Sequence, residues 1–479
     1  MITYNESLKG RILKEKSANK LIKIVSDLWF DKSIELILFR NSLVDKKGSE
    51  ILNLHSYARD ITKLSINISD TLQLAEVIQD NIVAPAKIDI GKLTYEWYQQ
   101  NKISINDFIK EKLAKIISQK QSRLIPKDVV LYGFGRIGRL LARELIIQEG
   151  KGEQLRLRAI VTRGVDEITL RKRASLLRMD SVHGKFPGSV EVDIENSVLI
   201  INGHTIHMIA ADSPESIDYT NYDIFKALII DNTGAFRSRD DLALHLKSKG
   251  VEKVLLTAPG KEGVPNIVHG VNQCKFNINK HKIYSAASCT TNAITPVLKV
   301  IEHNLGIKKG HIETIHAYTN DQNLVDNMHK KYRRGRAAAL NMVITETGAG
   351  KAVSKALPSL EGKLTSNAIR VPTPNGSLAI LNLSIKKVTN SKDLNNIMKQ
   401  ASLNGNLVEQ IQYSVSHELV SSDIIGNSCA AIFDSKATIV SGDGRTVVLY
   451  VWYDNEYGYT RQVVRLSKHI ADVRRFIYY

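Results

Sequence analysis

The pattern of apolar and polar positions changes character near residue 126. Before that point, apolar residues recur mostly at helical spacing over residues 5–30, 36–43 and 108–117. Asn106 precedes the last of these runs and is the expected N-cap. The segment has few glycines, no repeat and no phosphate-binding loop. It therefore predicts a mostly helical N-terminal extension that packs without carrying chemistry.

Beyond Pro126, short apolar runs rich in β-branched residues alternate with helical patterns. This alternation is typical of a doubly wound parallel sheet with helices on both faces. The expected strands are residues 128–132, 155–162, 227–231 and 254–257, and the first is followed by a helix over residues 140–147.

From about residue 291 the pattern becomes mixed and predicts a second domain of the α+β class. Long strands are expected at residues 312–316, 378–386 and 446–453, with helices at 291–304 and 391–402. A last helical pattern runs from Tyr459 to Phe476, and we expect this helix to return to the doubly wound domain. A chain of 479 residues is long enough for such a division.

Composition narrows the possible functions only slightly. The net charge of +17 would suit nucleic acid or small anionic ligands, but the sequence has no dense basic run. A lysine-rich solvated surface explains the charge, so nucleic acid is not an expected partner. The sequence contains no run of eighteen apolar residues, so it predicts no membrane-spanning helix. Three cysteines do not make a disulfide framework, and they suit a reducing cytoplasm.

Gly133-x-Gly135-x-x-Gly138 lies between an expected strand and an expected helix, which is the order that dinucleotide binding requires. The first glycine makes the tight turn and the second lets the backbone approach the pyrophosphate. The third lets the helix pack closely on the strand. The pyrophosphate would then lie on the free N–H groups at the start of the helix. The sequence therefore predicts a dinucleotide site at this turn.

Cys289 stands at the start of an expected helix, where the positive end of the helix dipole should lower the pKa of its thiol. Such a cysteine is a candidate nucleophile, whereas Cys274 and Cys429 have no comparable context and are read as structural. A nucleophile needs a base, and His316 lies 27 residues further on in a strand pattern. Spacing alone does not show that the two side chains meet. No metal-ligand spacing is visible.

Eight segments in fixed order resemble the phosphorylating glyceraldehyde-3-phosphate dehydrogenase family, in its longer bacterial form with an N-terminal extension. They are GFGRIGR (133–139), DSVHGKF (180–186), SCTTN (288–292), HAYTNDQ (316–322), RRGRAAA (333–339), TGAGKAV (347–353), RVPTPN (370–375) and WYDNEYGY (452–459). The resemblance covers residues 127–479. It implies a helical extension (1–126), a dinucleotide-binding domain (127–287), a catalytic domain (288–454) and a C-terminal helix (455–479) that returns to the dinucleotide-binding domain.

The resemblance also implies an activity. The protein would oxidise D-glyceraldehyde 3-phosphate reversibly to 1,3-bisphosphoglycerate, with inorganic phosphate as co-substrate and NAD or NADP as hydride acceptor. Such a reaction serves glycolysis or gluconeogenesis, and the family is usually a homotetramer. Cys289 would attack the aldehyde carbon, and His316 would polarise the aldehyde oxygen and take the proton as hydride leaves.

The binding residues are likewise implied by matching positions in the family pattern. Those for the substrate phosphate are Thr319, Asp321 and Arg370, and those for the attacking phosphate are Ser288, Thr290, Arg333, Thr347 and Gly348. Those for the cofactor are Gly133, Phe134, Gly135, Arg136, Ile137, Gly138, Thr162, Thr233, Gly234, Thr257, Asn455 and Tyr459.

Two departures from the family pattern concern the cofactor. Thr162 occupies the position of an acidic residue that usually binds the adenosine ribose, and Arg163 follows it. In a second loop, Asn327-Met328 replaces a Leu-Pro pair that is frequent in bacterial NAD enzymes. An acid at the first position would repel a 2′-phosphate, so its loss favours NADP. We therefore expect both cofactors to be used, with NADP used better than in a typical NAD-specific member.

Two rival functions remain open at this stage. An erythrose-4-phosphate dehydrogenase would share the fold and the nucleophile. A nucleic-acid or protein-binding module with a vestigial active site would account for the positive charge and the extension, although a vestigial site should have lost some of the phosphate-binding residues.

Overall fold

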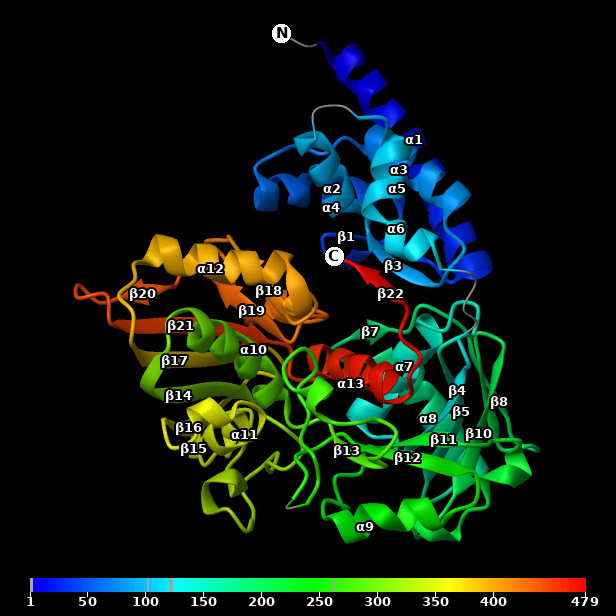
Figure 1. Cartoon of the computed structure of the whole chain (residues 1–479). Helices are drawn as coiled ribbons and strands as arrows, with labels where there is room; N and C mark the ends of the chain where they lie inside the picture. Colours follow the sequence, from blue (N-terminus) through cyan, green and yellow to red (C-terminus); the bar gives the residue numbers. More distant parts are fainter. Residues whose placement is uncertain (1–2, 101–102, 120–123, 262) are drawn as a thin grey trace. The chain divides into compact units, whose positions relative to one another are not determined.

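A computed structural model of the chain describes residues 3–100, 103–119, 124–261 and 263–479 (Figure 1). The chain forms two compact units, and each is described by itself. The first contains residues 1–126 together with residues 149–154 and 473–479, and the second contains residues 127–148 and 155–472. The N-terminal segment of the first unit thus runs to residue 126, and two short segments from later in the chain belong with it.

The first unit is mostly helical but also contains a four-stranded sheet. Its helices are α1 (Tyr4–Lys32), α2 (Gly48–Thr62), α3 (Ile68–Asn81), α4 (Ile90–Gln99), α5 (Ile105–Lys112) and α6 (Ala114–Ile117). The sheet has the order β2 (Asn41–Ser42), β1 (Glu35–Leu38), β3 (Ala86–Asp89) and β22 (Phe476–Tyr478).

The helix expected over residues 36–43 is wrong, because that segment forms β1, a turn and β2. Helix α1 ends at Lys32, and Ser33 has the left-handed conformation with φ of 55°. All four residues of β1 are buried, and β1 pairs in parallel with β3. A short, wholly buried apolar run has no periodicity that separates strand from helix. The helix expected after Asn106 begins one residue before it, since the Ser104 side chain caps α5.

The chain end forms the edge strand of this sheet. The expected C-terminal helix through Phe476 instead ends as α13 (Tyr457–Ile470), and Phe476 begins β22, which pairs in parallel with β3. Arg475 is buried beside it, with its guanidinium carbon 4.4 Å from the centre of the Trp29 ring. The last seven residues thus pack with the extension that opens the chain.

The second unit begins with an eight-stranded sheet that confirms the doubly wound prediction. Its order is β13 (Ile283–Ser285), β12 (Val251–Leu256), β11 (Ala227–Asp231), β4 (Lys127–Tyr132), β5 (Leu155–Thr162), β10 (His204–Ala210), β9 (Val198–Ile201) and β8 (Val190–Asp193). The run from β13 to β10 is parallel. Its helices include α7 (Arg136–Ile147), α8 (Glu167–Arg178) and α9 (Arg239–Ala243), and β6 (Met179–Asp180) pairs with β7 (Gly184–Lys185). Helix α13 packs on α7, with Arg461 paired to Glu144.

The rest of the second unit is built on a mixed sheet. Its order is β15 (Val343–Thr345), β16 (Leu364–Val371), β14 (Ile307–Ala317), β17 (Ser377–Ile385), β21 (Thr446–Tyr453), β19 (Ala431–Asp434) and β18 (Ile411–Ser414), with β20 (Ile439–Val440) beside β21. The helices are α10 (Cys289–Asn304), α11 (Ala349–Ala356) and α12 (Ser391–Leu403). Alternate residues of β17 and β21 are buried in one continuous apolar core with α10.

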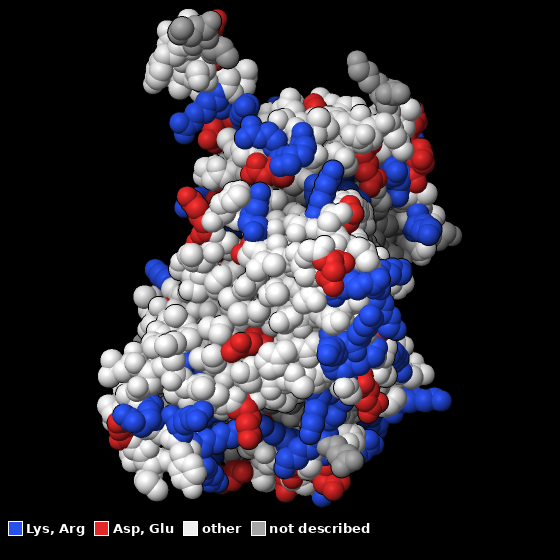
Figure 2. Space-filling model, turned by 90° about the vertical axis from the view of Figure 1, so that its left-hand side faces the viewer, with Lys and Arg blue, Asp and Glu red and all other residues white. Residues whose placement is uncertain are grey.

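Charged side chains of both signs are interspersed on the face drawn in Figure 2, which also carries a broad area with few charges. The net charge of +17 therefore does not gather into a single basic patch on that face. Among the described residues, no helix has the length and hydropathy needed to cross a membrane.

Candidate active site

Helix α10 presents Cys289 at its first turn, and the loop before it is held tightly. The Ser288 side chain caps the helix by accepting a hydrogen bond from the Thr291 N–H at 3.0 Å. Ala287 has a positive φ of 55°, a strained conformation for a residue with a Cβ. Its carbonyl accepts a hydrogen bond of 2.9 Å from the Tyr459 hydroxyl. Tyr459 was expected near the cofactor, and in the structure it fixes the loop that carries the nucleophile.

The structure brings the side chains of Cys289 and His316 together. Their spacing in the sequence does not show this contact. Sγ of Cys289 lies 3.5 Å from Nε2 of His316, near the end of β14. The other ring nitrogen, Nδ1, lies 2.7 Å from the Ala317 carbonyl oxygen. An Nδ1–H group that donates to this carbonyl leaves the lone pair of Nε2 directed at the thiol. This is the tautomer that a general base needs. In the other tautomer, Nδ1 would accept a hydrogen bond from Nη1 of Arg370 at 2.8 Å and the Nε2–H group would face the thiol.

Arg370 completes the group because β16 pairs in parallel with β14 and places it opposite His316. Its Nη1 donates to the Ala317 carbonyl at 2.9 Å and lies 2.8 Å from Nδ1 of His316. Burial lowers the pKa of His316 to about 4, and the Arg370 cation acts in the same direction. The imidazole is therefore neutral at physiological pH.

The expectation that the Cys289 thiol has a lowered pKa is wrong for this structure. Burial raises the pKa of the thiol, and the Arg370 cation opposes that rise without cancelling it. The helix terminus favours the thiolate, but removal of the sulfur from water disfavours any charge on it. The resting pair is thus a thiol beside a neutral imidazole, from which a proton can pass to Nε2.

Charged groups of both signs lie near His316. Thr319 donates to Asp321, and Asp321 is also paired with Arg334. Arg370 interacts electrostatically with both Asp321 and Arg334. The sequence analysis missed Arg334, the second arginine of the RRGR segment, and named Arg333 instead. No spacing rule distinguishes two adjacent arginines, whereas their surroundings differ clearly in the folded chain.

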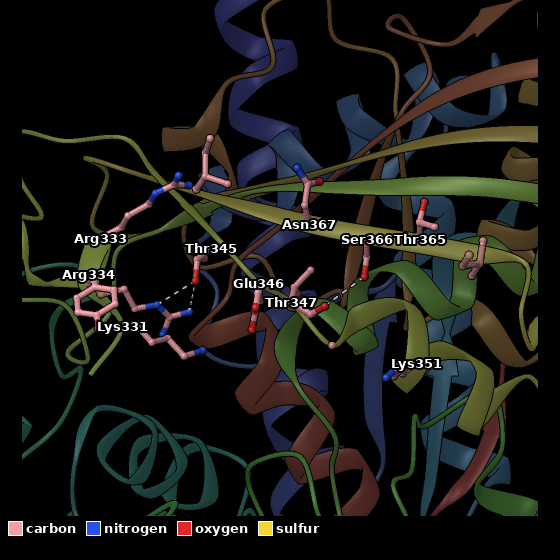
Figure 3. Close-up of a pocket in the computed structure, with 14 residues that line it drawn as sticks. Lys331, Arg333, Arg334, Thr345, Glu346, Thr347, Lys351, Thr365, Ser366 and Asn367 are labelled. Carbon is pink, nitrogen blue, oxygen red and sulfur yellow. Dashed lines mark hydrogen bonds between the residues drawn. The ribbon is translucent and has the colours of Figure 1, made fainter. Parts of the chain in front are cut away.

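The residues expected to bind the attacking phosphate fall into two groups. Arg333, Thr347 and Gly348 line a cavity of about 1050 Å³ beside β15 and α11 (Figure 3). Arg334 lines it as well and donates to the Thr345 hydroxyl at 3.0 and 3.2 Å, while Arg333 extends in another direction.

Ser288 and Thr290 are not among the lining residues of this cavity. They lie at the start of α10, where the Thr290 hydroxyl is 3.0 Å from the Tyr453 hydroxyl. The structure thus places one group beside the nucleophile and the other along the cavity that contains Arg334.

The glycine turn has the geometry that a dinucleotide requires. Gly133 has a φ of 94°, which favours glycine. A Cβ on Gly138 would lie 2.5 Å from the Gly133 carbonyl oxygen, so a larger residue would separate helix from strand. A Cβ on Gly135 would meet no atom within 4 Å, which leaves the backbone at the start of α7 open to a ligand. The residues present therefore fit a bound pyrophosphate.

A cavity of about 390 Å³ lies at the carboxyl ends of β4, β5, β10 and β11. Five residues expected to bind cofactor line it: Gly133, Phe134, Gly135, Thr162 and Thr233. The loop at Thr233 is fixed because the backbone N–H and hydroxyl of Thr233 both donate to Asp231, at 2.8 and 2.7 Å. Binding sites at the carboxyl ends of parallel strands are the rule for this architecture.

The other expected cofactor residues do not line this cavity: Arg136, Ile137, Gly138, Gly234, Thr257, Asn455 and Tyr459. Arg136 is paired with Asp180 and Glu456, and the side-chain oxygen of Asn455 accepts a hydrogen bond of 2.8 Å from Ser377. Asn327 and Met328 do not line it either, because they lie in the loop between β14 and β15, where Met328 is exposed.

Comparison with known proteins agrees with this architecture. Residues 127–239 match the family "Glyceraldehyde 3-phosphate dehydrogenase, NAD binding domain", and residues 288–455 match "Glyceraldehyde 3-phosphate dehydrogenase, C-terminal domain". A glyceraldehyde-3-phosphate dehydrogenase of Bacillus subtilis is 40% identical over 72% of this chain and 98% of its own length. One from Priestia megaterium is 41% identical over 71% of this chain and 96% of its own length.

A third relative includes the extension. A glyceraldehyde-3-phosphate dehydrogenase-like protein of Pseudomonas aeruginosa is 48% identical over 95% of this chain and 98% of its own length. The sheet order and the paired domains define an oxidoreductase with an NAD-binding domain. The chain belongs to the glyceraldehyde-3-phosphate dehydrogenase family, and the extended form is shared with the Pseudomonas protein.

Proposed function

We propose that this protein oxidises D-glyceraldehyde 3-phosphate to 1,3-bisphosphoglycerate, reversibly, with inorganic phosphate and NAD or NADP. The observation that carries the proposal is the 3.5 Å approach of Cys289 Sγ to His316 Nε2, with Arg370 beside the histidine. A nucleophile, a base and nearby cations are the groups needed to convert an aldehyde phosphate into a thioester.

In the first step, His316 takes the proton of the Cys289 thiol as Sγ forms a bond to the aldehyde carbon. The neutral imidazole is suited to accept that proton, which then passes to the aldehyde oxygen and gives a hemithioacetal. Arg370, Thr319 and Asp321 lie on the side where the substrate phosphate would bind, and Arg370 supplies its charge. His316 and Arg370 thus act on opposite ends of a short phosphorylated substrate.

In the second step, His316 accepts the hydroxyl proton of the hemithioacetal as the C–H bond breaks. A bound nicotinamide dinucleotide supplies the acceptor for the departing hydride, and the turn at Gly133–Gly138 would hold its pyrophosphate. Asn455, fixed by Ser377, would bind the nicotinamide carboxamide. The carbon is oxidised to a thioester on Cys289, which keeps the energy of the oxidation.

In the last step, inorganic phosphate attacks the thioester carbon, the C–S bond breaks, and Cys289 leaves as thiolate. Ser288, Thr290, Thr347 and Gly348 would bind the incoming phosphate, with a cation from the RRGR segment. Of the adjacent arginines Arg333 and Arg334, we favour Arg334 for this role, because it lies beside Thr345 and interacts with Arg370.

The experiment that tests the proposal is a steady-state assay of reduced cofactor at 340 nm. It compares glyceraldehyde 3-phosphate with erythrose 4-phosphate, each with NAD and NADP, with and without inorganic phosphate. The proposal requires phosphate-dependent turnover with a preference for glyceraldehyde 3-phosphate. Preference for the four-carbon aldehyde would identify the rival dehydrogenase, and salt-dependent DNA retardation without turnover would support a binding module.

A homotetramer is the proposed assembly. The segment from residue 324 to residue 344 exposes seven large apolar side chains, and such a concentration suits a subunit interface. They are Leu324, Val325, Met328, Tyr332, Leu340, Met342 and Ile344. Light scattering coupled to size-exclusion chromatography tests this assignment, and a monomer at micromolar concentration would contradict it.

A further inference from the structure

The cavity at the carboxyl ends of β4, β5, β10 and β11 is lined by two arginines from different elements. Arg163 directly follows β5, and Arg173 comes from α8. Asp212 is the acidic side chain in this lining. Two cations against one carboxylate leave the wall with an excess of positive charge, which favours an anionic ligand.

Arg173 has no evident structural role for its charge. It is half-buried, and its buried Nε has no hydrogen-bond partner among the described residues. Burial lowers the pKa of Arg173, and the neighbouring Arg139 cation acts in the same direction. Asp166 opposes both, but its carboxylate is already bound to Thr169 as the cap of α8. A cation held in this way costs free energy unless an anion binds to it.

The location of Arg173 indicates which anion this is. In this architecture the side chain at the end of the second strand meets the 2′ position of the adenosine ribose. Here that residue is Thr162, whose hydroxyl donates to the Gly164 carbonyl at 2.9 Å, so the end of this strand carries no carboxylate that would repel a phosphate. The pyrophosphate would occupy the N–H groups at the start of α7, which leaves the two arginines for a further phosphate.

We propose that Arg173 is the residue that binds the 2′-phosphate of NADP, with Arg163 as a second cation at the same group. The inference deepens the proposed function and rests on it for the presence of a dinucleotide in this cavity. A guanidinium presents several N–H donors to phosphate oxygens and keeps its charge at all physiological pH values.

The test measures binding of 2′,5′-ADP and of 5′-AMP to the full-length protein by isothermal titration calorimetry. The two probes differ by the 2′-phosphate, and neither requires a working active site. Replacement Arg173→Met should weaken 2′,5′-ADP by about ten-fold or more, since hydrogen bonds to charged groups are among the stronger ones. The same replacement should change the affinity for 5′-AMP by less than about two-fold, and Arg173→Lys should retain part of the affinity for 2′,5′-ADP.

Arg171→Met is the matched control. Arg171 lies on the same helix and is exposed, pairs with Glu167 at 2.7 Å, and does not line the cavity. This control removes the same charge and should leave both affinities unchanged.

Three results would overturn the assignment. An equal loss of affinity for both probes in Arg173→Met would mean that Arg173 binds another phosphate of the ligand or only stabilises the fold. Circular dichroism would distinguish these two roles. No loss of 2′,5′-ADP would remove Arg173 from the site. A loss of affinity for 2′,5′-ADP in Arg163→Met, with none in Arg173→Met, would show that Arg163 and not Arg173 binds the 2′-phosphate. Because no step needs turnover, failure here is distinguishable from failure of the proposed dehydrogenase activity, which the assay at 340 nm measures.

Discussion

Nε2 of His316 lies 3.5 Å from Sγ of Cys289, although the two residues belong to different elements. This contact arises because α10 begins beside the end of β14, where the parallel strand β16 places Arg370 next to the histidine. One sheet edge and one helix start thus place a nucleophile, a base and a cation together.

Replacement Cys289→Ser should abolish nearly all dehydrogenase activity while cofactor binding persists. A hydroxyl has a much higher pKa than a thiol, so a neutral imidazole cannot generate enough nucleophile from it. We expect kcat to fall by roughly 10³-fold or more. The assay at 340 nm measures the loss, and calorimetry with NAD measures retained binding. Turnover of the serine variant near that of the parent would refute the role of Cys289.

Removal of the Arg370 charge should make the thiol less reactive near neutral pH. Arg370 lowers the pKa of Cys289 against the dominant effect of burial, so Arg370→Gln raises that pKa further. The thiolate fraction is lost as pH falls through the thiol pKa, and this loss then begins at higher pH. The rate of Cys289 alkylation by iodoacetamide at pH 7 should drop on the order of ten-fold.

Peptide mass spectrometry must follow this reaction, because Cys274 is exposed and its alkylation has to be separated from that of Cys289. Arg333→Gln serves as the control, since Arg333 is an exposed cation, whereas Arg370 is the cation that lowers the pKa of the thiol. A pH profile of alkylation that is identical in Arg370→Gln and the parent would show that this cation does not influence Cys289.

The two neighbouring arginines of the RRGR segment should differ in their effect on phosphate. Arg334 is bound to Asp321 and Thr345 and interacts with Arg370, whereas Arg333 is exposed. Arg334→Met should therefore raise KM for inorganic phosphate by about ten-fold or more, and Arg333→Met should change it little. The reverse order would restore Arg333 as the phosphate ligand.

Much of the fold could be predicted from the sequence wherever the local pattern of a single segment was enough to identify the element. Strands β5 and β11 have the predicted bounds. Strand β11 is wholly buried and reads as a nearly continuous apolar run, whereas β5 alternates leucine with arginine before its buried apolar half. The turn at Gly133 was recognisable because the glycine spacing follows a strand pattern, and backbone geometry requires two of these glycines, Gly133 and Gly138. The cysteine at the start of α10 was visible for a similar reason, since the helix pattern begins there.

The remaining features depend on partners that are distant in the sequence. Strand β22 exists because β3 offers an edge almost four hundred residues earlier, and no local pattern records that edge. The raised pKa of Cys289 follows from burial, which helix position does not reveal. The choice between Arg333 and Arg334 depends on Asp321 and Thr345, and Arg173 became a candidate only when its cavity was visible.

Replacement Thr162→Asp should shift cofactor preference toward NAD. A carboxylate at the end of β5 would accept hydrogen bonds from the ribose hydroxyls and repel a 2′-phosphate. One repulsion of ~1.4 kcal/mol corresponds to about a ten-fold change in the ratio of kcat/KM values for NAD and NADP. Thr162→Ser is the matched control and should leave the ratio close to that of the parent. A parent enzyme that rejects NADP as strongly as enzymes with the acidic residue would contradict this interpretation of Thr162.

Arg475 should be a main stabilising residue of the first unit. It is buried beside Glu35 at 3.6 Å and lies over the Trp29 ring, so it joins the chain end to β1 and α1. Arg475→Met keeps much of the apolar stem but leaves Glu35 with a weaker set of cations, of which Lys87 at 3.5 Å remains. Breaking a buried ion pair and a cation–π contact should lower the local free energy of unfolding by ~2–4 kcal/mol.

Hydrogen exchange followed by mass spectrometry on the full chain measures this effect directly. Peptides that cover β1, β3 and β22 should exchange faster in Arg475→Met, because the edge strand is held partly through this side chain. Arg474→Met is the matched control, since Arg474 is adjacent, equally charged and exposed. Protection in β3 that is unchanged by Arg475→Met, or lowered equally by both variants, would show that the arginine does not hold the chain end on the extension.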